Sequence, residues 1–287
     1  MTDPAASAAA PAVQRPARRP AGSVAGWRPR AYGRVNWMGI WSHSRRGVKA
    51  FTDDALAYLC GPLVTSGLFL AVFVLALRGD AGPETTQALI DFVGPGIAAF
   101  MMIHHAFQHS AALLVMDKSE GVIQDLLMAP LSALEIMAGY VLSAVATALL
   151  IGGLILLMMV LVADLPILRP LALLGFALLG SVLFAVVGTL VGLWADKWEQ
   201  YSAAESFLIL PLGVLSGAFF RVDELAESWR WTVALNPVHH IVEGLRWSAL
   251  DGASGSPLSA AIVTLLLTAL LSVVAWRLFA VGYHIRP

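Results

Sequence analysis

Three histidines, His104, His105 and His109, lie close together in an otherwise apolar stretch of the chain. His105 and His109 are four residues apart, so they share one face of a helix. Imidazoles at this spacing could bind a metal ion or relay protons, and ionisable groups at membrane depth are often functional. Because no nearby side chain completes a plausible ligand set, we favour a polar packing role for these histidines and predict no metal site.

Two glutamates, Glu135 and Glu205, adjoin long apolar runs, where a carboxylate could carry protons. Each follows a serine by three residues, and the pattern Ser-x-x-Glu is typical of a capping box at a helix start. A carboxylate there also interacts favourably with the positive end of the helix dipole. We therefore predict that Ser132 with Glu135, and Ser202 with Glu205, cap two helices.

Few other residues in the chain have the types and spacing of a catalytic site. His239, His240 and Glu243 have the spacing of ligands, but no third ligand or paired acid accompanies them, which disfavours a hydrolase. Glu243 and Arg246 are three residues apart and are more simply an ion pair. No lysine follows a glycine, so the ATP-binding P-loop pattern is absent. We predict neither enzymatic activity nor a bound cofactor on this chain.

The composition is that of a membrane protein. Of 287 residues, 58% are hydrophobic and 13% charged, about half the charged fraction of a soluble domain. The mean hydropathy is +0.76. The net charge of −1 gives no basic field that would attract nucleic acid. These values nearly exclude a soluble enzyme.

The apolar runs predict an all-α membrane protein with six transmembrane helices. The first run holds 23 uncharged residues, or about 35 Å of helix, which is enough to cross a hydrocarbon core of about 30 Å. Pro211 is expected to kink the fifth helix. The predicted spans are 55–77, 89–116, 133–163, 171–194, 203–220 and 258–279.

The remaining segments complete the predicted organisation. Residues 1–32 are rich in Ala, Pro and Arg and are expected to form a disordered cytoplasmic tail. Residues 33–54 favour an amphipathic helix at the membrane surface, and residues 55–287 form the six-helix domain. Through Asp54 the chain has nine basic and three acidic residues, so the positive-inside rule places the N-terminus in the cytoplasm. An even number of spans returns the C-terminus there. The outer segment 221–257 is expected to contain re-entrant helices.

Four stretches in order carry a resemblance to a known family: 92–97 (Phe-Val-Gly-Pro-Gly-Ile), 117–135, 216–220 and 236–246. Together they resemble the type-2 ATP-binding-cassette (ABC) exporter permeases. In that family a charged residue plus Gly precedes a short inner-loop helix that ends in Pro-x-Ser, and an Asn-Pro…Arg element precedes the last span. The match covers most of the chain, from about Gly33 to Phe279.

The resemblance implies that the inner loop is a coupling helix gripped by an ATPase. Its residues would be Glu120, Gly121, Val122, Ile123, Asp125, Leu126 and Leu127. Asn236, Pro237 and Arg246 would form the outer re-entrant element. The apolar residues of the loop alternate with polar ones, as suits a segment held in a partner's groove.

The resemblance also implies a bacterial inner-membrane protein that works as a homodimer or a paired permease. ATP and Mg²⁺ would bind a separate ABC ATPase subunit, while this chain contacts membrane lipid. The first and fifth helices would line the dimer interface and the path of an exported amphiphilic cargo, which could be drug-like, lipid-linked or a glycan. The alternative is an ion-coupled secondary transporter, which would need intramembrane charge pairs and an inverted repeat.

Overall fold

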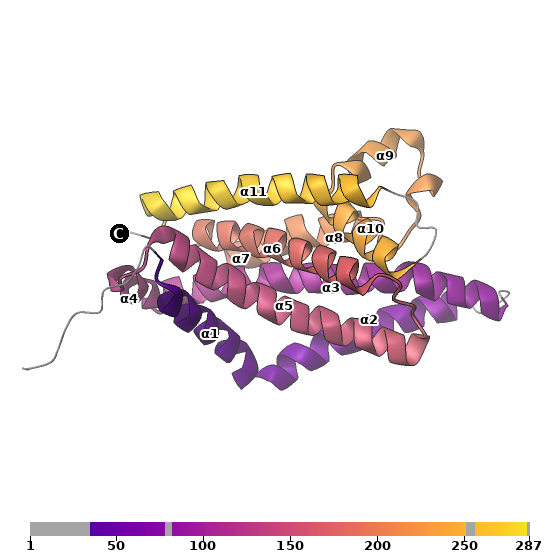
Figure 1. The fold of residues 1–287 in the computed structure, drawn as a ribbon, viewed down its shortest axis with the longest axis horizontal. Helices are drawn as coiled ribbons and strands as arrows, with labels where there is room; N and C mark the ends of the chain where they lie inside the picture. Colours follow the sequence, from indigo (N-terminus) through magenta and orange to yellow (C-terminus); the bar gives the residue numbers. More distant parts are fainter. Residues whose placement is uncertain (1–34, 78–81, 251–255, 286–287) are drawn as a thin grey trace, which may run out of the picture. The chain divides into compact units, whose positions relative to one another are not determined.

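The computed structural model describes residues 35–77, 82–250 and 256–285, and every regular element in these residues is helical. The predicted tail, residues 1–32, lies outside the described residues. The elements, labelled in Figure 1 where there is room, are α1 Trp37–Asp53, α2 Ala55–Leu77, α3 Pro83–Ser119, α4 Val122–Met128, α5 Ala133–Ala163, α6 Pro170–Trp194, α7 Trp198–Ala204, the π-helical turn η1 Glu205–Ile209, α8 Leu210–Val214, the 3₁₀ turn η2 Val222–Glu224, α9 Glu227–Ala234, α10 Pro237–Ala249 and α11 Pro257–Val281.

The core forms around α3, which packs most extensively against α5 and α6. Phe107 of α3, Tyr140 of α5 and Phe184 of α6 are all fully buried there. The close approach of α6 to α3 requires a glycine, because a Cβ atom at Gly188 would overlap the carbonyl oxygen of Phe107. Small residues allow such contacts between helices in lipid, where van der Waals packing stabilises association.

Five helices in the described part of the chain are long and apolar enough to cross a membrane: α2, α3, α5, α6 and α11. The all-α membrane class is therefore confirmed. α3 is longer than the predicted span 89–116 and continues through Pro95. In Figure 1, α4 lies near one end of these helices and α9 and α10 near the other, which we call the α4 end and the α10 end.

The fifth predicted span, 203–220, differs from the structure. The helical residues run from 198 to 214 and are interrupted by the π-helical turn η1, and residues 215–220 are not helical. Pro211 has no N–H to donate to the carbonyl four residues earlier. Directly before it, the N–H of Leu210 bonds instead to the carbonyl of Glu205, five residues back. The helix is thus irregular just before Pro211, where it contains a π-helical turn.

One of the two expected capping boxes is present. The hydroxyl of Ser132 accepts from the N–H of Glu135, and the Glu135 carboxylate accepts from the N–H of Ser132 at 2.6 Å. The other oxygen of that carboxylate accepts from the N–H of Asn36 at 2.5 Å. Because Asn36 is the N-cap of α1, Glu135 ties together the starts of α1 and α5.

The second expected box, Ser202 with Glu205, is wrong. The helix has already begun at Trp198, so Ser202 lies inside α7, where it is no N-cap. Glu205 opens the π-helical turn, and its carboxylate is directed to His104 of α3. A local sequence pattern identifies a cap only where the helix starts at that residue.

Candidate functional site

The short helix α4 connects α3 to α5, where the coupling helix was expected. Gly121 precedes it with φ +78°, a left-handed conformation that glycine adopts without a steric penalty. The expected apolar docking face is divided between two sides of the helix. Ile123 is 4% exposed and belongs to the core, which corrects its assignment to the docking face. Val122 and Leu126 are half-buried.

The outward side of α4 consists of four exposed residues, which we call the α4 face: Gln124, Asp125, Leu127 and Met128. Glu120, just before the helix, is exposed too. Gln124, Leu127 and Met128 are three and four residues apart and share one side of the helix. Two large apolar side chains thus lie on the surface beside polar ones, an arrangement suited to a protein partner.

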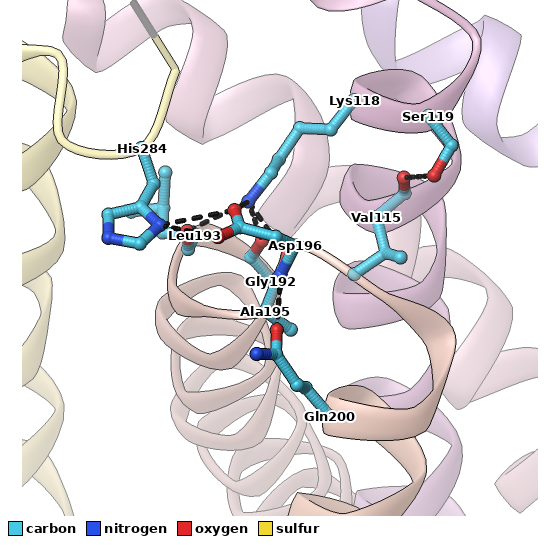
Figure 2. A network of polar contacts seen from close by, with 9 residues as sticks. All are labelled: Val115, Lys118, Ser119, Gly192, Leu193, Ala195, Asp196, Gln200 and His284. Atoms are coloured by element: carbon cyan, nitrogen blue, oxygen red, sulfur yellow. Dashed lines mark hydrogen bonds and ion pairs between the residues drawn. The ribbon is translucent and has the colours of Figure 1, made fainter.

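The end of α3, next to α4, is held by Lys118. Its ammonium group donates to the carbonyl oxygens of Leu193 at 2.9 Å and Ala195 at 2.7 Å, and lies 3.0 Å from the Asp196 carboxylate (Figure 2). A cation is favourable at the C-terminal end of α6, where the carbonyls lack helical partners. His284 contacts the same carboxylate at 3.0 Å. Lys118 and then His284 lower the pKa of Asp196.

The preceding residue, Asp117, makes a second junction. Its carboxylate is fully buried and accepts from both terminal nitrogens of Arg46, one at 2.7 Å, and from the hydroxyl of Tyr140 at 2.5 Å. Bidentate pairs of this kind fix geometry as well as charge. Asp117 therefore joins α3 to α1 and α5, while Lys118 joins α3 to the end of α6 and to Asp196, which also contacts His284. The sequence motifs did not predict a role for either side chain.

α1, Trp37–Asp53, lies within the expected segment 33–54, and its buried side packs mainly against α5. His43 is buried there with no hydrogen-bond partner for either ring nitrogen among the described residues. Its ring contacts the edge of Tyr140 at 4.5 Å, and a Cβ atom at Gly139 would overlap it. Burial, and then the charge of Arg46, lowers the pKa of His43 to about 4, although Asp117 opposes the shift.

This pKa predicts acid-sensitive packing of α1. The unfolded pKa of 6.5 exceeds the folded value of about 4, so the unfolded state binds the proton more readily. Neutral His43 contributes to the free energy of unfolding. This contribution is fully present above pH 6.5 and is lost between pH 6.5 and 4. At pH 5 the loss should be about 2 kcal/mol relative to pH 7. Thermal unfolding across this pH range shows whether the wild type loses stability that His43→Leu retains. If the stabilities of the two proteins change in parallel with pH, the prediction is wrong.

His105 is buried and His109 half-buried beside Phe51 of α1, with ring centroids 5.5 and 6.4 Å from the Phe51 ring. The Nε2 atom of each has no hydrogen-bond partner in the described ranges. His104 points elsewhere, since its Nε2 lies 2.8 Å from Oε1 of Glu205. The structure therefore separates the three histidines into two packing residues and one that pairs with a carboxylate.

The outer element forms at the α10 end. Asn236 caps α10 by accepting from Val238 N–H at 2.9 Å, and its side-chain amide donates to the Leu212 carbonyl at 2.7 Å. Pro237 occupies the first turn, where its missing N–H costs nothing. Asn236 thus connects the start of α10 to α8.

Arg246, within α10, makes further contacts at the α10 end. It is buried, pairs with Glu243 as expected, and donates to the carbonyls of Phe92 at 3.1 Å and Gly217 at 3.0 Å. Its guanidinium lies 3.8 Å from the centre of the Phe92 ring, a cation–π contact. Asn236 therefore fastens the outer segment to α8, and Arg246 fastens it to α3 and to the turn after α8.

Comparison with known proteins identifies related sequences. The pattern of the ABC-2 type transporter family matches residues 38–250. The inner membrane transport permease YadH of Escherichia coli K12 is 25% identical over 251 residues, covering 87% of this chain and 98% of YadH. Nodulation protein J of Sinorhizobium fredii is 27% identical over 238 residues, covering 77% and 83% of the two chains. Nodulation protein J of Rhizobium leguminosarum bv. viciae is 25% identical over 218 residues, covering 75% and 82%.

Proposed function

Because the chain belongs to the ABC-2 type transporter family, as a multi-pass membrane permease of an ABC transporter, we propose that it moves an amphiphilic cargo outward across the bacterial inner membrane. The cargo classes that remain open are drug-like, lipid-linked and glycan molecules. Energy comes from ATP, bound with Mg²⁺ on a separate ATPase subunit. Two permeases form the path, as two copies of this chain or as this chain with a paired permease.

The α4 face is the observation that carries this proposal. Leu127 and Met128 are exposed on a seven-residue helix that has no spanning role. Exposed apolar side chains at a fixed position favour a partner whose groove covers them. In the proposal that partner is the ATPase, and the α4 end of the bundle, with both termini, is cytoplasmic.

The junctions beside α4 suit it to transmit movement. α4 follows directly after the end of α3, where Asp117 contacts α1 and α5, and Lys118 contacts α6. A shift of α4 caused by the ATPase therefore acts on α3 and, through hydrogen bonds and ion pairs, on α1, α5 and α6. Coupling of this kind travels through packed, hydrogen-bonded elements that have two arrangements.

We further propose that α1 lies at the cytoplasmic membrane surface. Trp37 and Trp41 are exposed, and so are Arg45 and Lys49 on the same helix. Indole rings favour the headgroup region, and cations favour anionic lipid. The side that contains His43 and Phe51 packs on the bundle instead.

Purification and transport test the proposal together. The tagged full chain, isolated in mild detergent from its host, should retain an ABC ATPase in a fixed ratio. Inside-out vesicles that contain the complex should accumulate fluorescent amphiphiles only with ATP, and ionophores that collapse ion gradients should not stop uptake. Uptake that needs an ion gradient and no ATP would favour the secondary transporter instead.

A further inference from the structure

The π-helical turn places an acidic side chain opposite α3. Oε1 of Glu205 lies 2.8 Å from Nε2 of His104 and 3.4 Å from the side-chain nitrogen of Gln108. The pair is not sealed from its surroundings, since the side chains of His104 and Glu205 are 23% and 18% exposed. Glu205 is the first residue of this π-helical turn and directly follows α7.

The pair lies near the middle of the membrane-spanning part of α3. His104 is thirteen residues before Asp117 and twelve after Phe92, which correspond to roughly 20 Å of helix on either side. On its own helical run, Glu205 lies six residues, or about 9 Å, beyond the exposed Glu199. Ionisable groups at such depth are costly and usually serve a function.

The surroundings of Glu205 are aromatic. Phe100 stacks on the His104 ring at 5.8 Å, and Tyr201 is one turn before Glu205 on the same helical run. Aromatic faces attract cations, most strongly where water is excluded.

Glu205 supplies a carboxylate to this region. Among the described residues, His104 is the only basic side chain that pairs with Glu205; neither a lysine nor an arginine does so. Contacts with the His104 ring and with the side-chain nitrogen of Gln108 hold the carboxylate in place. An anionic group would be repelled there, and an uncharged sugar would gain nothing from the charge.

We propose that Glu205, oriented by His104 and Gln108 and flanked by Phe100 and Tyr201, binds the positive centre of a lipophilic organic cation as it crosses the membrane. This inference rests on the proposed function and narrows its cargo to amphiphiles that combine a positive charge with an apolar or aromatic body. The carboxylate supplies the electrostatic attraction, while the rings contact the apolar body.

Equilibrium binding of radiolabelled tetraphenylphosphonium tests the site directly. The full-length chain is reconstituted in phosphatidylcholine vesicles, and partition into protein-free vesicles is subtracted. The wild type should bind saturably. Glu205→Gln should weaken binding at least tenfold because the charge is lost, whereas Glu205→Asp should stay within about threefold. Glu199→Gln, which removes an exposed carboxylate on the same helical run, is the matched control and should not change binding.

A second measurement needs no variant. Dicyclohexylcarbodiimide modifies carboxyl groups within membranes, and mass spectrometry locates the modified residues. Tetraphenylphosphonium should slow the modification of Glu205 at least threefold and leave that of Glu199 unchanged. Absence of saturable binding to the wild type, equal binding by Glu205→Gln, or unprotected Glu205 would each overturn the inference.

The same preparations separate this inference from the proposed function. Retention of the ATPase and its hydrolysis of ATP are measured on the wild type and on Glu205→Gln. An active complex without a cation site refutes the inference and leaves the exporter proposal standing. Cation binding by a chain that retains no ATPase refutes the exporter proposal instead.

Discussion

Arg46→Ala is expected to destabilise the protein by about 3–5 kcal/mol, the usual effect of removing one partner from a buried ion pair. The Asp117 side chain is fully buried, so without Arg46 its charge is left with only the hydroxyl of Tyr140. α1 should also loosen from the bundle around Arg46, because its ion pair with Asp117 at the end of α3 is lost. Denaturant unfolding and hydrogen exchange of α1 amides measure the two effects.

Asp117→Asn is the matched variant, and its effect should be smaller, about 1–2 kcal/mol. Arg46 is 36% exposed, so its charge can turn toward water when its partner is neutral. The amide oxygen that replaces the carboxylate can still accept from the hydroxyl of Tyr140. A larger loss of stability in Asp117→Asn than in Arg46→Ala would contradict this explanation. The destabilisation of Arg46→Ala would then not come from an unpaired buried carboxylate.

Leu127→Asp is expected to weaken binding of the ATPase subunit at least tenfold while the permease folds normally. Leu127 is exposed, so the change costs the isolated permease little. Truncation of an apolar anchor in a groove costs about 2 kcal/mol or more, and about 1.4 kcal/mol corresponds to a factor of ten in affinity. Titration of the purified ATPase against the reconstituted permease gives the affinity, and stimulated ATP hydrolysis gives the coupling.

Two further variants define what this result means. Leu235→Asp changes an exposed leucine at the α10 end and should leave ATPase binding unaltered. Ile123→Asp should instead unfold or misassemble the protein, because Ile123 lies in the core. Unchanged affinity and hydrolysis with Leu127→Asp would remove α4 from the ATPase interface and weaken the case for an ATP-driven exporter.

Some properties of the α4 segment follow from the sequence, and others depend on the tertiary structure. Its glycine, its length and its place between two spans were predictable, because they depend on local backbone preferences and on uncharged runs on either side. The side of α4 that faces the bundle was not predictable. Apolar residues occupy several sides of two short turns, so periodicity does not distinguish Ile123, which is buried, from Leu127, which is exposed.

The sequence by itself determined the membrane class, the uncharged stretches that form the long helices, and the cap at Ser132, since each follows from composition or from contacts within a few residues. Only the tertiary structure decided that Asp117 meets Arg46, 71 residues away, and that Glu205 meets His104 across 101 residues. Those pairings depend on how the helices pack against one another, and no local pattern encodes that packing.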